Sequence, residues 1–154
     1  LLFEAGKKIN LNIFKGGTYL TMEGPQFSTL AESLLYKNVW NCDVIGMTNM
    51  PEAKLAREAE MGYASIGMVT DYDCWHKNHD AVTVDQVIKI MQVNTNNVKM
   101  LLLSILENLD KIKKWDWNDK VYSCLNEAVI TTKDSISSKT FKKLQPILKR
   151  RFTL

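Results

Sequence analysis

Cysteine is scarce in this chain, and no apolar run in it is long. The three cysteines, Cys42, Cys74 and Cys124, are odd in number and widely spaced, which argues against a disulfide framework and favours a reducing compartment. The longest apolar run, residues 100–103, is far shorter than the roughly 20 residues that span a bilayer. We therefore expect a cytoplasmic protein with no membrane partner.

A strong excess of one charge sign is also absent. The 20 lysines and arginines nearly balance the 17 aspartates and glutamates, for a formal net charge of +3, so no nucleic-acid partner is implied. The locally basic tail, residues 139–151, is typical of a solvated helix face. A chain of 154 residues, 45% of them hydrophobic, is long enough for one domain with its own core. It opens on Leu1 rather than methionine, which we interpret as a piece of a longer protein.

Several helices and strands can be predicted from turns, caps and periodicity. Residues 9–14 alternate apolar and polar side chains, and Gly16-Gly17 followed by residues 19–22 predicts a hairpin. A capping box of Thr29 and Glu32 predicts a helix over residues 30–40. A strand over 43–48, a helix from Pro51 to Met61 and a strand over 62–70 predict a crossover unit with parallel strands.

The second half of the chain reads as mainly helical. Thr83 and Gln86 form another capping box, which opens a long amphipathic helix with a weak point at residues 94–97. Residues 111–117 are expected to connect it to a shorter helix around 121–129. Ser137 or Ser138 caps a last helix, which Pro146 is expected to end or kink.

Two carboxylates, Asp71 and Asp73, stand where the apolar run 63–69 stops. Ligands collect at the carboxyl ends of strands in open α/β sheets. A carboxyl group partly removed from water holds a proton more readily, so Asp71 is a candidate general acid, although a surface turn aspartate is the commoner reading. A metal site is a second reading, although its spacing matches none of the usual Cys/His pairings. Its candidate ligands are Asp71, Asp73, Cys74, His76 and His79.

Two more residues allow a functional and a structural reading. Phe27, in a loop before a capped helix, could stack on a planar ligand or pack in the core. Thr48, at the end of its strand, could bind an anion or simply start the next helix.

Several blocks of sequence together resemble the S-methyl-5′-thioadenosine phosphorylase family, within the purine nucleoside phosphorylases. They are Glu23-Gly24-Pro25-Gln26-Phe27-Ser28-Thr29, the block from Val44 to Glu58 and Thr70-Asp71-Tyr72-Asp73-Cys74-Trp75, and they follow one another in family order. The resemblance implies an α/β three-layer sandwich, with a mixed central β-sheet flanked by helices, and a homotrimer. It also implies that residues 1–154 are the C-terminal part of a single nucleoside phosphorylase domain.

The implied reaction is the phosphorolysis of S-methyl-5′-thioadenosine to adenine and S-methyl-5-thioribose 1-phosphate. Inorganic phosphate is the co-substrate, and neither a metal nor an organic cofactor is expected. Asp71 is the implied catalytic acid. The implied substrate contacts are Phe27 against the purine, Met47 beside the ribose, Thr48 on phosphate, Thr70, Asp71 and Asp73 at the purine edge, and Val84 and Val87 around the methylthio group.

Two alternatives stay open beside this hypothesis. One is a purine nucleoside phosphorylase of broader specificity, although related enzymes for 6-oxopurines usually carry asparagine where Asp71 stands. The other is a non-catalytic binding or metal-holding module built on the acidic and histidine cluster. The resemblance also implies that the family's first half, with most of its phosphate-binding elements, has no counterpart here, so the chain by itself could be inactive.

Overall fold

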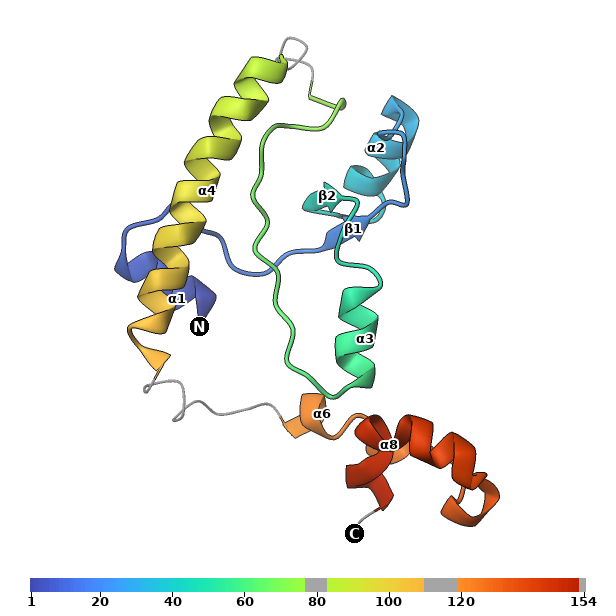
Figure 1. Cartoon of the computed structure of the whole chain (residues 1–154). Coiled ribbons are helices and arrows are strands. Elements are labelled where there is room, and N and C mark those ends of the chain that lie inside the picture. Colours follow the sequence, from blue (N-terminus) through green and yellow to red (C-terminus); the bar gives the residue numbers. More distant parts are fainter. Residues whose placement is uncertain (77–82, 110–118, 153–154) are drawn as a thin grey trace. The chain divides into compact units, whose positions relative to one another are not determined.

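The computed structural model describes residues 1–76, 83–109 and 119–152 (Figure 1). The chain divides into two compact units, one of Leu1–Thr48 with Ile66–Trp115 and one of Asn49–Ser65 with Asp116–Leu154. The elements are α1 (Leu2–Lys8), β1 (Tyr19–Thr21), α2 (Leu30–Asn38), β2 (Val44–Gly46), α3 (Glu52–Glu58), α4 (Val84–Leu106), α6 (Asp119–Tyr122), α7 (Leu125–Ala128), the 3-10 helix η1 (Lys133–Ser135) and α8 (Ser138–Phe152).

A parallel pair of strands lies in the first unit. β1 pairs with β2, Tyr19 opposite Val44 and Thr21 opposite Gly46. Parallel neighbours need a crossover connection, and α2 provides it. The chain is therefore α/β, and its crossover is β1–α2–β2.

The predicted capping boxes are both confirmed. The Thr29 side chain accepts a hydrogen bond from the Glu32 amide, and the Glu32 side chain accepts one from the Thr29 amide. Thr83 and Gln86 form the same reciprocal pair at the start of α4. Each box satisfies two amides that the first helical turn leaves without a partner, which is why the two helices begin where the sequence predicts.

The predicted hairpin over residues 9–22 is wrong. β1 pairs with β2 instead, and residues 9–18 form no strand. The backbone amides of Asn10 and Leu11 donate to the carbonyls of Lys7 and Gly6, at 3.0 and 2.9 Å. These bonds terminate α1, a helix that the alternating pattern did not reveal, and they remove donors that a hairpin ladder would need.

The predicted strand over residues 62–70 is also wrong. The segment is described throughout but forms no strand, and the sheet of the described residues consists of β1 and β2. The Val69 carbonyl accepts a hydrogen bond from the Asn94 side-chain amide at 2.9 Å, and the Met68 and Val69 side chains are exposed. An apolar run indicates that a segment is suited to burial. A β-strand also needs a second strand hydrogen-bonded beside it, and the run does not reveal whether one is present.

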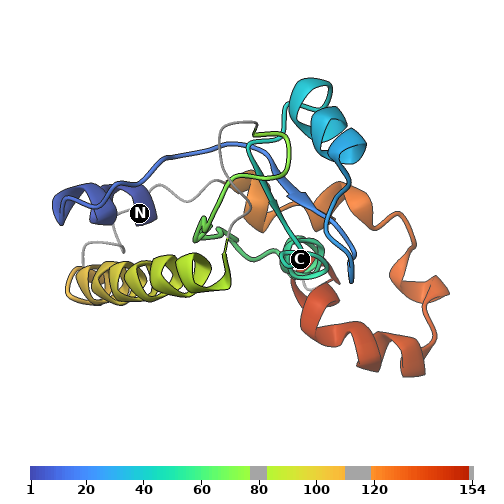
Figure 2. The same ribbon diagram turned by 90° about the horizontal axis from the view of Figure 1, so that it is seen from above.

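The long helix α4 is continuous across residues 94–97, where the sequence indicated a weak point. Asn94 bonds to Val69, and the Thr95 hydroxyl donates to the Met91 carbonyl at 2.8 Å. The Asn94 side chain therefore bonds to a neighbouring segment, whereas the Thr95 hydroxyl is satisfied by its own helix without interrupting it. α4 lies beside α1 (Figure 2), and its Leu101 side chain is buried in the first unit.

The last third of the chain differs in detail from the prediction. The helix expected around residues 121–129 is two short helices, α6 and α7. α8 continues past Pro146, so of the two predicted effects the proline does not end the helix. The Ser137 hydroxyl oxygen accepts a hydrogen bond from the Thr140 amide at 3.2 Å, as the cap prediction requires. Residues 111–117 lie outside the described residues. None of the helices in the described ranges is both long and apolar enough to span a bilayer.

Candidate active site

Asp71 and Asp73 lie on one loop of the first unit but have different surroundings. Asp71 is exposed, and its Oδ2 accepts a hydrogen bond from the Thr70 hydroxyl at 2.7 Å. Asp73 is half-buried and accepts from Ser28, Ser33 and the Cys74 amide. The structure therefore brings Asp73 to the first turn of α2, whereas Asp71 is exposed, as in the surface-turn reading, and not partly removed from water as expected for a general acid.

Aromatic contacts hold the same loop. Tyr72 stacks on His76 with ring centroids 4.5 Å apart, and Trp75 lies edge-on to Tyr72. The Lys37 ammonium of α2 lies 2.8 Å from the centroid of the Trp75 ring, a cation–π contact. The loop that carries the two acids is thus fastened to α2 by both polar and aromatic side chains.

Phe27 precedes the capped start of α2, and its ring is 85% exposed. Its core-packing interpretation is wrong in this chain, because a packed ring would be covered. An exposed aromatic ring in the loop joined to α2 is available to a flat ligand.

Met47 and Thr48 follow β2. A Cβ atom on Gly24 would lie 3.1 Å from the Met47 sulfur, so the glycine allows the close approach of these two loops. The Thr48 carbonyl accepts a hydrogen bond from the Thr21 hydroxyl at 2.8 Å. This bond joins the carboxyl ends of β1 and β2, so the structure places Thr48 at the edge of the parallel pair where ligands collect in this class of sheet.

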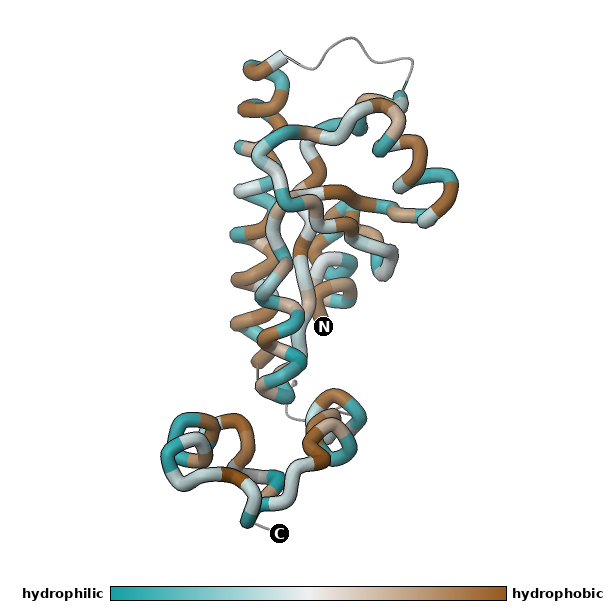
Figure 3. The backbone as a smooth tube through the Cα atoms, turned by 90° about the vertical axis from the view of Figure 1, so that its right-hand side faces the viewer, coloured by the Kyte–Doolittle hydropathy of each residue, from teal (hydrophilic) through white to brown (hydrophobic). Residues whose placement is uncertain are grey.

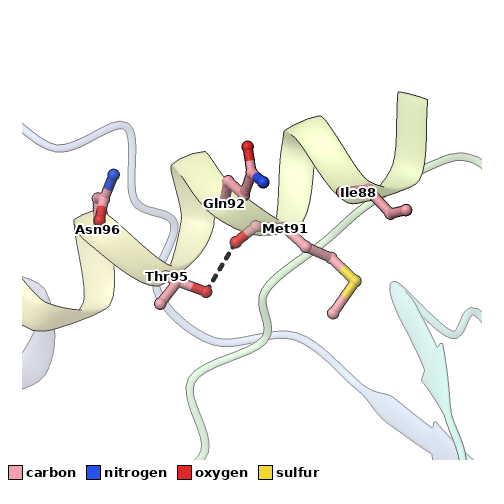
Figure 4. Close-up of a pocket in the computed structure, with 5 residues that line it drawn as sticks. All are labelled: Ile88, Met91, Gln92, Thr95 and Asn96. Carbon is pink, nitrogen blue, oxygen red and sulfur yellow. Dashed lines mark hydrogen bonds between the residues drawn. The ribbon is translucent and has the colours of Figure 1, made fainter. Parts of the chain in front are cut away.

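Val84 and Val87 lie in the first turn of α4. The next turns of the helix line a hollow of about 520 Å³, shown in Figure 4. The lining residues are Ile88, Met91, Gln92, Thr95 and Asn96. Because residues three, four and seven apart share a helix face, Val84, Ile88, Met91 and Thr95 form one stripe. Ile88, Met91 and Thr95 were not predicted as site candidates, although their spacing continues from Val84.

Ser28 and Ser33 were also missed. Ser33 is 1% exposed, but a serine in a helical pattern carries no sequence signal for burial.

The capping box at the start of α2 has an electrostatic consequence. Hydrogen bonds from the Thr29 amide and hydroxyl lower the pKa of Glu32 below its ordinary value of 4.5.

The metal-site alternative finds no support in the part of the chain that the structure describes. There, no three histidine, cysteine, aspartate or glutamate side chains lie close enough to hold an ion. His79 lies outside the described residues. The three cysteines are free thiols.

A family model described as the phosphorylase superfamily matches residues 1–107. The chain belongs to this superfamily. All of the predicted site residues, from Phe27 to Val87, fall inside the matched region.

Curated relatives within the phosphorylase superfamily are similar over nearly the whole chain. The S-methyl-5′-thioadenosine phosphorylase of Koribacter versatilis is 50% identical over 137 residues, which cover 89% of this chain and 45% of that protein. The protein of the same name from Rhodospirillum rubrum is 48% identical over 136 residues, or 88% of this chain and 46% of the relative. The chain thus spans about half the length of the curated relatives it matches.

Solved phosphorylase structures are likewise similar to most of this chain over about half of their own length. A methylthioadenosine phosphorylase from an antarctic soil metagenomic library superposes with a TM-score of 0.79 at 37% identity, over 96% of this chain and 51% of that one. The methylthioadenosine phosphorylase of Schistosoma mansoni, solved in complex with adenine, has a TM-score of 0.63 at 31% identity, over 79% of this chain and 47% of that one. The chain therefore has the fold of part of a nucleoside phosphorylase.

Proposed function

We propose that this chain forms the purine-binding part of an enzyme that cleaves S-methyl-5′-thioadenosine with inorganic phosphate. The observation that carries the proposal is the identity of 50% and 48% to curated relatives with that name. The adenine held by the Schistosoma mansoni structure supports a purine ligand. In the whole enzyme, β1 and β2 would belong to the mixed central sheet of a three-layer sandwich, and the enzyme would be a homotrimer. The free cysteines support a cytoplasmic location.

The reaction exchanges one bond at the sugar for another. A phosphate oxygen bonds to the anomeric carbon, the carbon–nitrogen bond to adenine breaks, and its electron pair leaves with the base. Asp71 shares a proton with a ring nitrogen of the departing adenine, which stabilises the transition state more than the ground state. No step calls on a metal or an organic cofactor.

The other residues bind the two substrates. The exposed Phe27 ring stacks on the purine, Thr70 and Asp73 face its edge with Asp71, and Met47 borders the ribose. Thr48, at the strand edge, contacts phosphate. Val84 and Val87 cover the methylthio group, and an apolar wall of this kind favours a thioether over a hydroxyl, though only by about 10–200-fold per methylene-sized difference.

The test is phosphate-dependent release of adenine from S-methyl-5′-thioadenosine. We would use a chimera that joins this chain to the part of the Koribacter versatilis relative that it does not match, with adenosine and inosine as parallel substrates. We expect adenine release from methylthioadenosine, lower release from adenosine, and none without phosphate. Release of hypoxanthine from inosine as the main activity would move the protein to the broader purine nucleoside phosphorylases. A chimera that cleaves none of the three would contradict the proposal.

A further inference from the structure

The Asp73 carboxylate is occupied by three donors from the protein. Its Oδ2 accepts from the Ser33 hydroxyl at 2.5 Å and from the Ser28 hydroxyl at 3.2 Å, and its Oδ1 accepts from the Cys74 amide at 2.8 Å. A second, longer Ser28 contact reaches Oδ1 at 3.5 Å. Hydrogen bonds to an ionised group are about twice as strong as neutral ones, so this set fixes the position of the side chain.

The donors come from the segment that also carries Phe27. Ser28 is the next residue along the chain, and Ser33 lies in the first turn of α2 with its own amide bonded to the Thr29 carbonyl at 2.9 Å. The Cys74 thiol donates to the Ser28 carbonyl at 3.7 Å. These bonds therefore join the Phe27 loop to the loop of Asp71 and Asp73, which are the two segments assigned to the purine.

We propose that Ser33 is a positioning residue that, with Ser28, holds Asp73 as a fixed hydrogen-bond acceptor and so selects purines with an exocyclic amine. A carboxylate offers about four acceptor sites, and protein donors take three of them at Asp73. A ligand group that meets the remaining site must donate. The amine of a 6-aminopurine donates, whereas the carbonyl oxygen of a 6-oxopurine is a second acceptor. This selection rests on the proposed function. The tether, by which we mean the hydrogen bonds of Ser28 and Ser33 to Asp73, does not.

The tether can be tested in the chain as it exists, without activity. Cys74 is exposed, and its amide and thiol both take part in the joined loops, so its alkylation by iodoacetamide reports their release. We expect Ser33→Ala to raise the Cys74 rate by about tenfold, the scale set by one hydrogen bond to a charged group, and Ser28→Ala to raise it less. Cys42 and Cys124 are internal references, resolved by peptide mass spectrometry. Ser104→Ala, which changes another buried serine (6% exposed), is the matched control and should leave Cys74 unchanged.

A double substitution separates the tether from general loosening. Once Asp73→Ala has removed the acceptor, adding Ser33→Ala should not raise the Cys74 rate further, because the two residues act through one bond. Additive effects, or a Ser33→Ala chain that reacts like the unaltered one, would overturn the tether.

Selectivity is then measured in the chimera. Ser33→Ala should lower the preference for adenosine over inosine, as a ratio of kcat/KM, by about tenfold, while Ser104→Ala leaves the ratio alone. If Ser33→Ala speeds the alkylation of Cys74 but leaves the adenosine-to-inosine ratio of kcat/KM unchanged, the positioning role is wrong. A chimera that is inactive before any substitution would contradict the proposed function instead, and the alkylation result would still decide the tether.

Discussion

The two aspartates of the candidate site are two positions apart, yet their side chains are available for different tasks. Asp73 is engaged by α2, whereas Asp71 has the Thr70 hydroxyl as its partner and is exposed. An acid that is to exchange a proton with a leaving base needs an oxygen that the protein does not occupy. Asp71 meets this requirement, and Asp73 serves better as a fixed contact.

Replacing Asp71 by asparagine tests this division of roles. We expect Asp71→Asn in the chimera to lower kcat for methylthioadenosine by about 10²–10⁴-fold, the usual contribution of a general acid, and to raise the relative activity on inosine. Initial rates of adenine and hypoxanthine release give both numbers. Asp134→Asn, in η1, is the control and should change neither. Unaltered adenine release together with no gain on inosine would remove Asp71 from the chemistry.

Individual site residues could be proposed from the sequence where a candidate role follows from residue type and position in the chain. A threonine after a strand indicates a candidate ligand edge, and this holds for Thr48 after β2. Acids after an apolar run do so only when the run is a strand, which residues 62–70 are not. Ser33 could not be found this way, because its importance comes from burial against a residue 40 positions away. The sequence contains Ser33 and Asp73, but it does not show that the fold brings the two side chains together.

At the scale of elements, the capped helix starts were predicted well, whereas strands were predicted correctly at β1 and β2 but wrongly at residues 9–14 and 62–70. A capping box such as Thr29 with Glu32 is complete within four residues, so local sequence determines it. A strand depends on a neighbour that can come from anywhere in the chain. Residues 9–14 and 62–70 have strand-like patterns without a strand beside them, whereas β1 has β2.

The two capping boxes should respond differently to acid. Hydrogen bonds from Thr29 lower the pKa of Glu32, so the stabilisation by this box is fully present above the ordinary pKa of 4.5 and is lost as pH falls through the lower folded value. The α4 box uses Gln86, which does not titrate. We therefore expect amide protection in the first turn of α2, corrected for intrinsic exchange, to fall with acid, while protection at the start of α4 stays level.

Glu32→Gln supplies the control for this prediction. The glutamine keeps an oxygen for the Thr29 amide but loses the titration, so α2 should become as insensitive to acid as α4. Parallel losses in both helices of the unaltered chain would show that acid acts on the fold in general and not on the Glu32 carboxylate.

At the scale of the whole molecule, α4 carries more apolar surface than its neighbours in the described ranges cover. Hydrophobic residues recur along its length (Figure 3), and Met100, Leu102, Leu103 and Leu106 are between 47% and 59% exposed. Exposed apolar patches of this kind mark interaction surfaces. Since the curated relatives are about twice as long as the matched region, we expect the rest of a phosphorylase to cover part of this helix.

Two leucines on α4 distinguish covered from uncovered surface. Leu101 is 2% exposed and Leu103 is 59% exposed. We expect Leu101→Ala to lower the free energy of unfolding by about 2–5 kcal/mol in the chain and in the chimera. Leu103→Ala should change the chain by less than about 0.5 kcal/mol but destabilise the chimera by about 2 kcal/mol or more. Urea unfolding of the four variants and their two unaltered parents gives these values. A Leu103→Ala chimera as stable as its parent would place that face of α4 in solvent.

The two compact units are interleaved along the chain, and this affects the order in which the protein can fold during synthesis. The backbone leaves the first unit after Thr48, returns to it at Ile66 and leaves it again after Trp115. A ribosome that has translated residues 49–65 has made a piece of the second unit whose remainder, from Asp116 onward, comes much later. The first unit is complete once Trp115 has been made, so it can fold ahead of the second, as N-terminal domains usually do. The second unit cannot form by parts in the same way, because α3 must wait for the C-terminal helices.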